Sequence, residues 1–194
     1  MWGIQTMLRK FIEQYTRVPD DEWLIINEAF ERKLFAKNEI ILKEGSVCRH
    51  FYFLQTGLIR CFTIFDGTDI TKYFTVAPYC FTSIESFTKQ KPAEESIQTL
   101  EESVIWFASA KKLEQLKISN SWNEFTTRLL QEVQQFSKNS LLDAKTKTAD
   151  QRYRELLINK PEAIQRIPLK YLSSYLGVAP QSLSRIRKNL TKRN

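Results

Sequence analysis

Leu176-Gly177-Val178-Ala179-Pro180-Gln181-Ser182-Leu183-Ser184-Arg185-Ile186 (LGVAPQSLSRI) lies close to the end of this 194-residue chain and decides how its C-terminal part folds. Glycine readily adopts the positive φ that ends a helix. Proline suits the first turn of the next helix, because its missing N–H is not needed there. The stretch therefore predicts a helix that ends at Leu176, a turn at Gly177 and a second helix that begins near Pro180.

The apolar residues around this turn predict two helices that pack against each other. They recur at helical spacing: Leu169, Leu172 and Leu176 before the turn, then Leu183, Ile186 and Leu190 after it. The small Ser173 is expected where the helices meet. The outward face of the second helix then carries Gln181, Ser182, Arg185 and either Lys188 or Asn189. Because Arg can bond guanine O6 and N7 together, and Gln can bond adenine N6 and N7, this face is typical of a helix that reads DNA.

Charge is distributed unevenly along the chain. Residues 151–194 contain ten Lys/Arg and two Asp/Glu, a net charge of +8, whereas residues 1–150 contain 19 basic and 20 acidic residues, a net charge of −1. This asymmetry favours a polyanionic partner at the C-terminal end only. The residues expected to neutralise phosphates are Lys170, Arg187, Lys188, Lys192 and Arg193. An ordinary helical hairpin with a solvated outer face is the alternative interpretation.

The first part of the chain predicts helices followed by strands. Helical spacing covers residues 4–16 and 20–34, and the second segment begins with the acidic turn Asp20-Asp21-Glu22. Runs rich in β-branched and aromatic residues predict strands over 40–42, 51–54, 58–65, 70–76, 95–100 and 103–107. Asp66-Gly67 between two of these runs predicts a tight hairpin turn. Many short strands of this kind indicate a sandwich, a barrel or a jelly roll.

A long helix is predicted between these strands and the basic end. A short helix is expected over residues 109–116, and about 25 residues from Ser121 then contain neither Gly nor Pro. The apolar stripe of this helix consists of Trp122, Phe125, Leu129, Val133 and Phe136. Spacing alone favours neither a core face nor a seam between two copies of the helix. Thr148-Ala149-Asp150-Gln151 has the form of a capping box and predicts a new helix that ends near Asn159.

These elements predict an α+β chain in three parts. Residues 1–118 form a β-jelly roll with flanking helices, residues 119–147 a long connecting helix, and residues 148–194 a helix-turn-helix unit. No apolar run is long enough to cross a membrane. The N-terminus lacks the pattern of a signal peptide, so a cytoplasmic location is expected.

The cysteines and the motif content argue against several kinds of chemistry. Cys48, Cys61 and Cys80 are odd in number and widely spaced, which disfavours disulfides and leaves their role open. Together with the single histidine, His50, they make a poor ligand set, so no metal and no other cofactor is expected. The chain lacks GxSxG, Walker A and HExxH motifs, so enzyme activity is not expected either.

The order of parts resembles the Crp/Fnr family of bacterial transcription regulators. The resemblance covers nearly the whole chain and is strongest over residues 167–188 (IPLKYLSSYLGVAPQSLSRIRK), which look like the branch common in Bacteroidetes. It implies a cyclic-nucleotide-binding-like β-roll, a homodimer through the stripe of the long helix, and a palindromic site on double-stranded DNA. RNA polymerase is an implied partner if the protein activates transcription. Arg185 falls where the family has its base-reading arginine, but Pro180 and Gln181 depart from the family, so no operator sequence carries over.

Two departures from the family pattern concern the effector pocket and the end of the chain. Members that bind cyclic AMP hold the ribose with Gly-Glu and the phosphate with Arg next to Ser or Thr, where this chain has Thr82, Ser83, Ala93 and Glu94. An acid in place of that arginine would repel a phosphate, so the pocket is expected to be empty or to take a less anionic small-molecule effector. Because the sequence stops at Asn194, the β-hairpin wing after the recognition helix is expected to be missing.

Three functions follow in order of preference. The first is a homodimeric, sequence-specific DNA-binding regulator with a degenerate effector pocket. The second is a small-molecule sensor or partner-binding module, whose β-roll binds an unknown ligand and whose helices engage a protein. Salt-dependent binding to duplex DNA separates these two. The third, an enzyme on a cupin-like roll, is disfavoured because such enzymes commonly hold a metal with several histidines.

Overall fold

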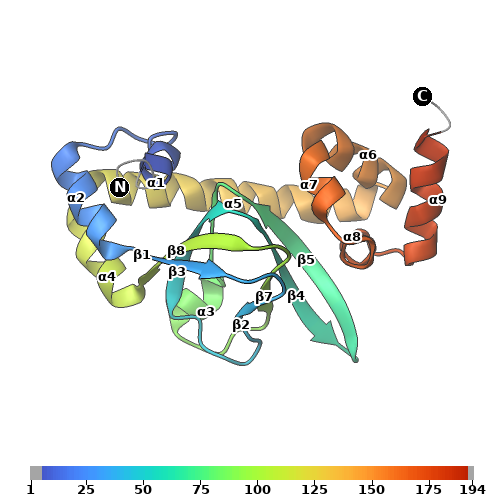
Figure 1. Ribbon diagram of the computed structural model, residues 1–194, viewed down its shortest axis with the longest axis horizontal. Coiled ribbons are helices and arrows are strands. Elements are labelled where there is room, and N and C mark those ends of the chain that lie inside the picture. The colour runs from blue at the N-terminus through green and yellow to red at the C-terminus, as the bar shows by residue number, and fades with distance from the viewer. Residues whose placement is uncertain (1–5, 192–194) are drawn as a thin grey trace.

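The computed structural model describes residues 6–191, in the order helices, strands, helices (Figure 1). The first helices are α1 (Thr6–Ile12) and α2 (Asp20–Ala29). The strands are β1 (Glu31–Phe35), β2 (Ile40–Leu42), β3 (His50–Thr56), β4 (Leu58–Phe65), β5 (Thr68–Val76), β6 (Tyr79–Phe81), β7 (Ser96–Thr99) and β8 (Ser103–Ser109), with helix α3 (Ile84–Lys89) after β6. The remaining helices are α4 (Ala110–Gln115), the 3₁₀ turn η1 (Leu116–Ile118), α5 (Asn120–Thr146), α6 (Ala149–Asn159), α7 (Pro161–Arg166), α8 (Leu169–Leu176) and α9 (Pro180–Thr191).

The strands form a β-roll of two antiparallel sheets, as the sequence predicts. One sheet has the strand order β1-β8-β3-β6 and the other β2-β7-β4-β5. The expected hairpin joins β4 to β5, whose last pair is Phe65 with Thr68. Asp66 and Gly67 both have positive φ, 48° and 72°, which is the backbone that a two-residue hairpin turn requires.

Four elements in and around the roll differ from the sequence prediction. Helix α2 stops at Ala29, and the residues expected to continue it to position 34 form β1 instead. This strand pairs with β8 from Glu31 opposite Phe107 to Phe35 opposite Ser103, so long-range pairing overrides the local helical spacing. Strand β6 and helix α3 were also not predicted, since each is very short.

The first half of α5 belongs to the hydrophobic core of its own chain. Trp122, Phe125 and Leu129 are 4%, 0% and 6% exposed and pack with α1, α2 and the β3–β8 sheet. The prediction that these three residues form a dimer seam is therefore wrong, because side chains already buried within the protomer offer no surface to a partner. The spacing could not distinguish the two uses, since the core and a seam require the same stripe.

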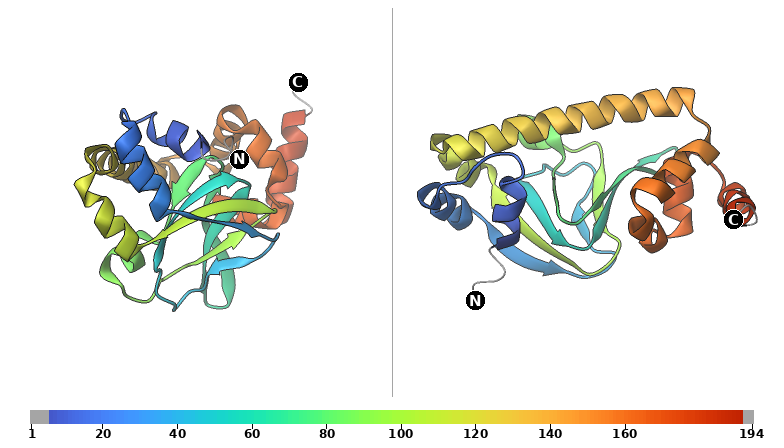
Figure 2. Two further views of the ribbon diagram at one scale, coloured as in Figure 1. Left: turned by 60° about the vertical axis from the view of Figure 1, so that its left-hand side comes forward. Right: turned by 90° about the horizontal axis from the view of Figure 1, so that it is seen from above.

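The second half of α5 runs beyond the core toward the C-terminal helices (Figures 1 and 2). Val133 is half-buried, whereas Phe136 is 52% exposed. Leu141 and Leu142 are further large apolar side chains exposed along this half, and Leu130 is exposed just before it. Helix α6 then begins with the expected capping box between Thr148 and Gln151. Within residues 6–191, no helix combines the length and the apolar character that a membrane crossing needs.

Candidate nucleic-acid interface and effector pocket

Helices α8 and α9 meet at the turn that the sequence predicts. Gly177 has φ 68° and caps α8, its N–H bonding the carbonyls of Ser173 and Ser174. Pro180 opens α9. Of the residues expected inside, Leu172 is 0%, Ser173 1%, Leu176 1% and Leu183 0% exposed, whereas Leu169, Ile186 and Leu190 are half-buried. The buried leucines form one cluster with Tyr153 of α6 and Ile164 of α7, so the two helices have a fixed geometry.

The opposite face of α9 carries most of the predicted base-reading residues. Gln181, Arg185 and Lys188 are exposed, and Ser182 is half-buried. Lys170, near the start of α8, is exposed as well, with its Nζ 4.5 Å from the centre of the Tyr171 ring. Neither α8 nor α9 contains an acidic residue, so no carboxylate within these helices competes with a polyanion for the basic side chains.

Arg187 lies differently from the prediction. Its guanidinium is 5.7 Å from the centre of the Tyr153 ring, so the side chain turns toward the packed side of α9. The expectation that Arg187 faces phosphates is not met in this arrangement, since a cation over an aromatic ring is attracted to the ring's negative face. Lys192 and Arg193, also expected at phosphates, lie outside the described residues.

A small polar pocket lies on the roll where the resemblance implied an effector site. It has a volume of about 100 Å³ and is lined by Lys72, Ser83, Glu85, Ser86, Lys91, Pro92, Glu94 and Glu95. Glu95 is its central acid, with a side chain only 13% exposed that forms an ion pair with Lys72 and accepts a 2.7 Å hydrogen bond from the Ser83 hydroxyl. The predicted pocket residues Ser83 and Glu94 thus contribute to the lining.

The other two predicted pocket residues point elsewhere. The Thr82 hydroxyl donates to the carbonyl of His50 at 2.9 Å. Ala93 is 4% exposed and exchanges backbone hydrogen bonds with Gly45 and Ser46. Glu94, with a side chain 77% exposed, lies at the rim of the pocket. The carboxylate that a bound phosphate would meet inside the pocket is that of its neighbour Glu95. The sequence predicts the position of such loop residues only to within one residue, because a loop has no periodicity that fixes its register.

The pocket also contains two cations, Lys72 and Lys91, that the family pattern does not predict. Lys72 is the extra residue of β5 at a bulge, because Cys61 pairs with Tyr73 and Phe62 with Thr71. Lys91 pairs with Glu85 at 2.8 Å. Hydrogen bonds from Lys91 and Lys89 lower the pKa of Glu85 to about 2. Two lysines therefore face three glutamates, and both lysines already have carboxylate partners.

Metal binding and cysteine chemistry are the subject of two further observations on the described part of the chain. Across residues 6–191 there is no group of three or more His, Cys, Asp or Glu side chains placed to hold a metal ion. Cys48, Cys61 and Cys80 are buried free thiols. Burial raises the pKa of Cys61 to about 12, and it also raises that of Cys80, so both favour the unreactive thiol form.

Comparison with known proteins agrees with this architecture. Residues 32–120 match the family model described as the cyclic nucleotide-binding domain. No curated protein sequence is significantly similar to the chain. Among solved structures, a regulator of the Crp/Fnr family from Eubacterium rectale, itself described as putative, has a TM-score of 0.69 at 16% identity, covering 91% of this chain and 85% of that one.

Two further structures are similar over most of their length. A variant of CooA from Carboxydothermus hydrogenoformans has a TM-score of 0.68 at 13% identity, covering 86% of this chain and 78% of its own. The regulator CLP of Xanthomonas campestris, described as responsive to c-di-GMP, has a TM-score of 0.66 at 16% identity, covering 90% and 93%. The chain therefore shares its fold with these regulators, and its residues 32–120 match the cyclic nucleotide-binding domain.

Proposed function

We propose that this chain is a homodimeric, sequence-specific DNA-binding transcription regulator of the Crp/Fnr type, in the branch common in Bacteroidetes. Residues 1–118 serve as the sensor unit, 119–147 as the connecting helix, and 148–194 as a helix-turn-helix that binds a palindromic operator. The observation that carries the proposal is the outer face of α9, where Gln181, Arg185 and Lys188 are exposed on a helix without acidic residues. Arg and Gln are the side chains that read guanine and adenine in the major groove.

The pocket supports a regulator that does not take cyclic AMP in the usual way. A cyclic phosphate placed there would approach Glu95 and would have to compete with it for Lys72. The described lining contains no arginine, the side chain best suited to hold a phosphate through two hydrogen bonds. A less anionic small molecule is the effector that this lining favours. We also propose that the exposed half of the stripe, around Phe136, forms the dimer contact.

Selection of random duplex DNA against the purified protein, with and without a panel of cyclic nucleotides, tests the proposal. A palindromic motif enriched without ligand supports it. Enrichment only with a cyclic nucleotide overturns the interpretation of the pocket. No enrichment under any condition overturns the DNA-binding function and favours a sensor or partner-binding module, for which the pocket on the roll would then be the site to probe.

Role assignments on the selected sequence are tested by substitution. Arg185→Ala should weaken binding by about 1–3 kcal/mol and relax the preference at one base position. Lys170→Ala should weaken all sequences alike and reduce the salt dependence by about one charge. Arg32→Ala, an exposed arginine on β1, is the matched control and should bind like the wild type. Identical behaviour of Arg185→Ala and Lys170→Ala on every sequence would contradict the assignment.

A further inference from the structure

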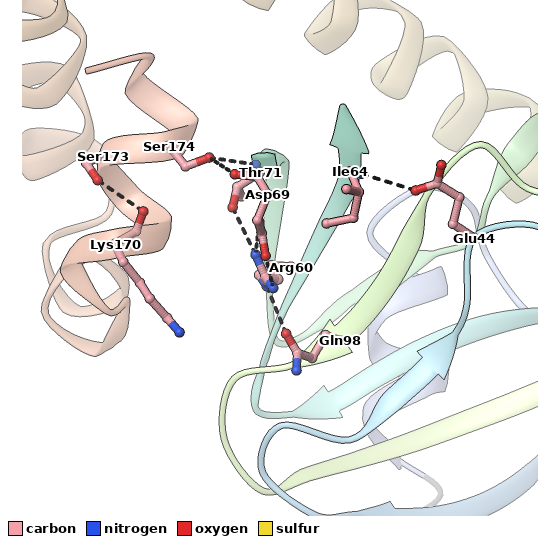
Figure 3. Close-up of polar contacts among 9 residues, drawn as sticks. All are labelled: Glu44, Arg60, Ile64, Asp69, Thr71, Gln98, Lys170, Ser173 and Ser174. Atoms are coloured by element: carbon pink, nitrogen blue, oxygen red, sulfur yellow. Dashed lines mark hydrogen bonds and ion pairs between the residues drawn. The ribbon is translucent and has the colours of Figure 1, made fainter. Parts of the chain in front are cut away.

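The β-roll and the C-terminal helices are joined by a contact between β5 and α8 (Figure 3). Strand β5 is the last strand of its sheet, so one side of its backbone is left open. The Ser174 hydroxyl of α8 covers this edge: it accepts a hydrogen bond from the N–H of Thr71 at 2.9 Å and donates one to the carbonyl of Asp69 at 3.0 Å. A single side chain of α8 thus satisfies two strand groups that a further strand would otherwise pair.

Arg60 of β4 lies at the centre of the same contact. Arg60 is only 3% exposed. Its guanidinium lies between two aromatic rings, 3.8 Å from the centre of the Phe62 ring and 3.6 Å from that of the Tyr171 ring on α8. Asp69 accepts from both of its terminal nitrogens, at 2.6 and 2.8 Å, and Gln98 accepts from Nε at 2.9 Å. This planar set of partners fits a guanidinium and not a lysine ammonium.

Apolar packing surrounds this polar centre. Leu58 and Leu100 of the roll are 0% and 3% exposed and share one cluster with Leu172 and Leu176 of α8. The rings of Phe74 and Tyr175 lie 5.5 Å apart across the contact. The contact therefore buries apolar surface, stacks aromatic rings and satisfies polar groups, as a fixed interface does.

The docked arrangement leaves the proposed DNA-reading face open. Gln181, Arg185 and Lys188 of α9 are exposed while α8 is held on the roll. We propose that Arg60 is a positioning residue for DNA reading: it fixes α8, and through the turn at Gly177 also α9, at one place on the β-roll. This inference rests on the proposed function. It adds that the β-roll takes part in DNA recognition, because it fixes the position of α9 in each protomer.

The consequence in a dimer concerns the distance between half-sites. Two reading helices bind half-sites whose separation mirrors the separation of the helices. If α9 is fixed to the roll, one spacing should be strongly preferred. If α6–α9 move freely on the chain around Lys147, several spacings should be accepted. Loss of Arg60 should therefore relax the preference for spacing and leave the preference for half-site bases unchanged.

The experiment measures binding of the selected palindrome and of versions with one or two base pairs added or removed between half-sites. Wild type should lose about tenfold or more in affinity for each altered spacing, whereas Arg60→Met should differ by less than about threefold among spacings. Ser174→Ala removes only the hydroxyl that binds β5 and should relax the spacing preference in the same way, so it replaces Arg60→Met if that variant does not fold. Arg32→Met is the matched control. Unchanged spacing preference in folded Arg60→Met and Ser174→Ala overturns the proposal.

Amide hydrogen exchange by NMR, without DNA, tests the docking separately. The Thr71 amide and the amides of α8 should exchange faster in Arg60→Met and Ser174→Ala than in wild type and Arg32→Met. Unchanged exchange in both variants overturns the proposal. If wild type binds no duplex at all, the proposed function fails, and the exchange data then decide alone whether Arg60 fixes α8 to the roll.

Discussion

Glu22 shows how one side chain ties the N-terminal helices to the long helix. Its carboxylate accepts hydrogen bonds from the Ser119 hydroxyl and from both the hydroxyl and the N–H of Ser121, at 2.7 and 2.9 Å. It therefore supplements Ser119, whose own hydroxyl accepts from the Trp122 N–H at the start of α5. The hydrogen bonds from Ser119 and Ser121 lower the pKa of Glu22.

Lowering the pH should reduce the free energy of unfolding, in part because the Glu22 carboxylate becomes protonated. A lowered pKa means that the folded state binds the proton less readily than the unfolded chain, so the stabilisation is complete above the ordinary value near 4.5 and is lost as the pH falls through the folded pKa. Glu22→Gln should lower stability at pH 7 by at most about 1 kcal/mol and make the melting temperature less dependent on pH below 5. Thermal melts from pH 3 to 7 measure this. The exposed Glu28→Gln on α2 is the control, and equal pH dependence in both variants would contradict the assignment.

The cysteines should resist modification in the folded protein. All three are buried, which keeps a reagent from reaching their sulfur atoms, and burial also raises the pKa of Cys61 to about 12, so that almost none of this thiol is ionised at pH 8. A chromogenic disulfide reagent should react with three thiols per chain in denaturant and far more slowly under native conditions. Rapid native reaction of even one thiol per chain would show that this part of the roll opens readily.

Two glycines at element ends should respond differently to the same substitution. Gly177 has φ 68°, and a Cβ there would meet nothing within 4 Å, so Gly177→Ala should cost only the strain of a left-handed residue, about 1–2 kcal/mol. Gly57, with φ 112°, lies between β3 and β4, and a Cβ there would be 2.9 Å from the Cα of Ser103 and still closer to its side chain. Gly57→Ala should therefore destabilise the protein more, as denaturant unfolding of both variants would show. The reverse order would contradict the argument.

Elements were predictable where one local signal determined them. The Asp66-Gly67 turn, the Thr148–Gln151 capping box and the Gly177 turn each depend on a few neighbouring residues, and all three are found where expected. Strand β1 was not predictable, because its pairing with β8 depends on residues more than 65 positions away. The division of the α5 stripe between core and surface also depends on tertiary packing, which spacing does not encode.

Candidate-site residues followed the same rule. The outer face of α9 could be read from periodicity, since a helix fixes which residues share a face. Arg60 could not, because its partners Asp69, Gln98 and Tyr171 come from three other elements and only the fold brings them together. Lys72 escaped notice for a related reason: a bulge interrupts the alternation that would otherwise assign its side chain to one face.

At the scale of the whole molecule, the exposed half of α5 is the surface on which proposed dimerisation depends. Phe136 is 52% exposed on one protomer, and Val133, one turn before it on the same stripe, is half-buried. Phe136→Glu should weaken dimerisation at least tenfold, because a charge would have to be buried against an apolar partner. Sedimentation equilibrium measures the change. Gln131→Glu, an exposed position away from the stripe, is the control. A wild-type monomer at micromolar concentration, or equal behaviour of the two variants, would contradict the assigned seam.

The bulge at Lys72 limits which insertions and deletions the β4–β5 hairpin can accept during evolution. Lys72 lines the pocket, while Thr71 and Asp69, immediately before it, hold α8 through Ser174. Loss of Lys72 would remove the bulge and with it a cation of the pocket, whereas loss of another residue within β4 or β5 would shift the pairing and turn the following positions of that strand to the opposite face. Relatives that keep both contacts should therefore differ by substitution on the body of β4 and β5, and should accept insertions or deletions only at the tip, around residues 66 and 67. In β4 and β5, evolution should therefore conserve the number of residues more strictly than the residue types.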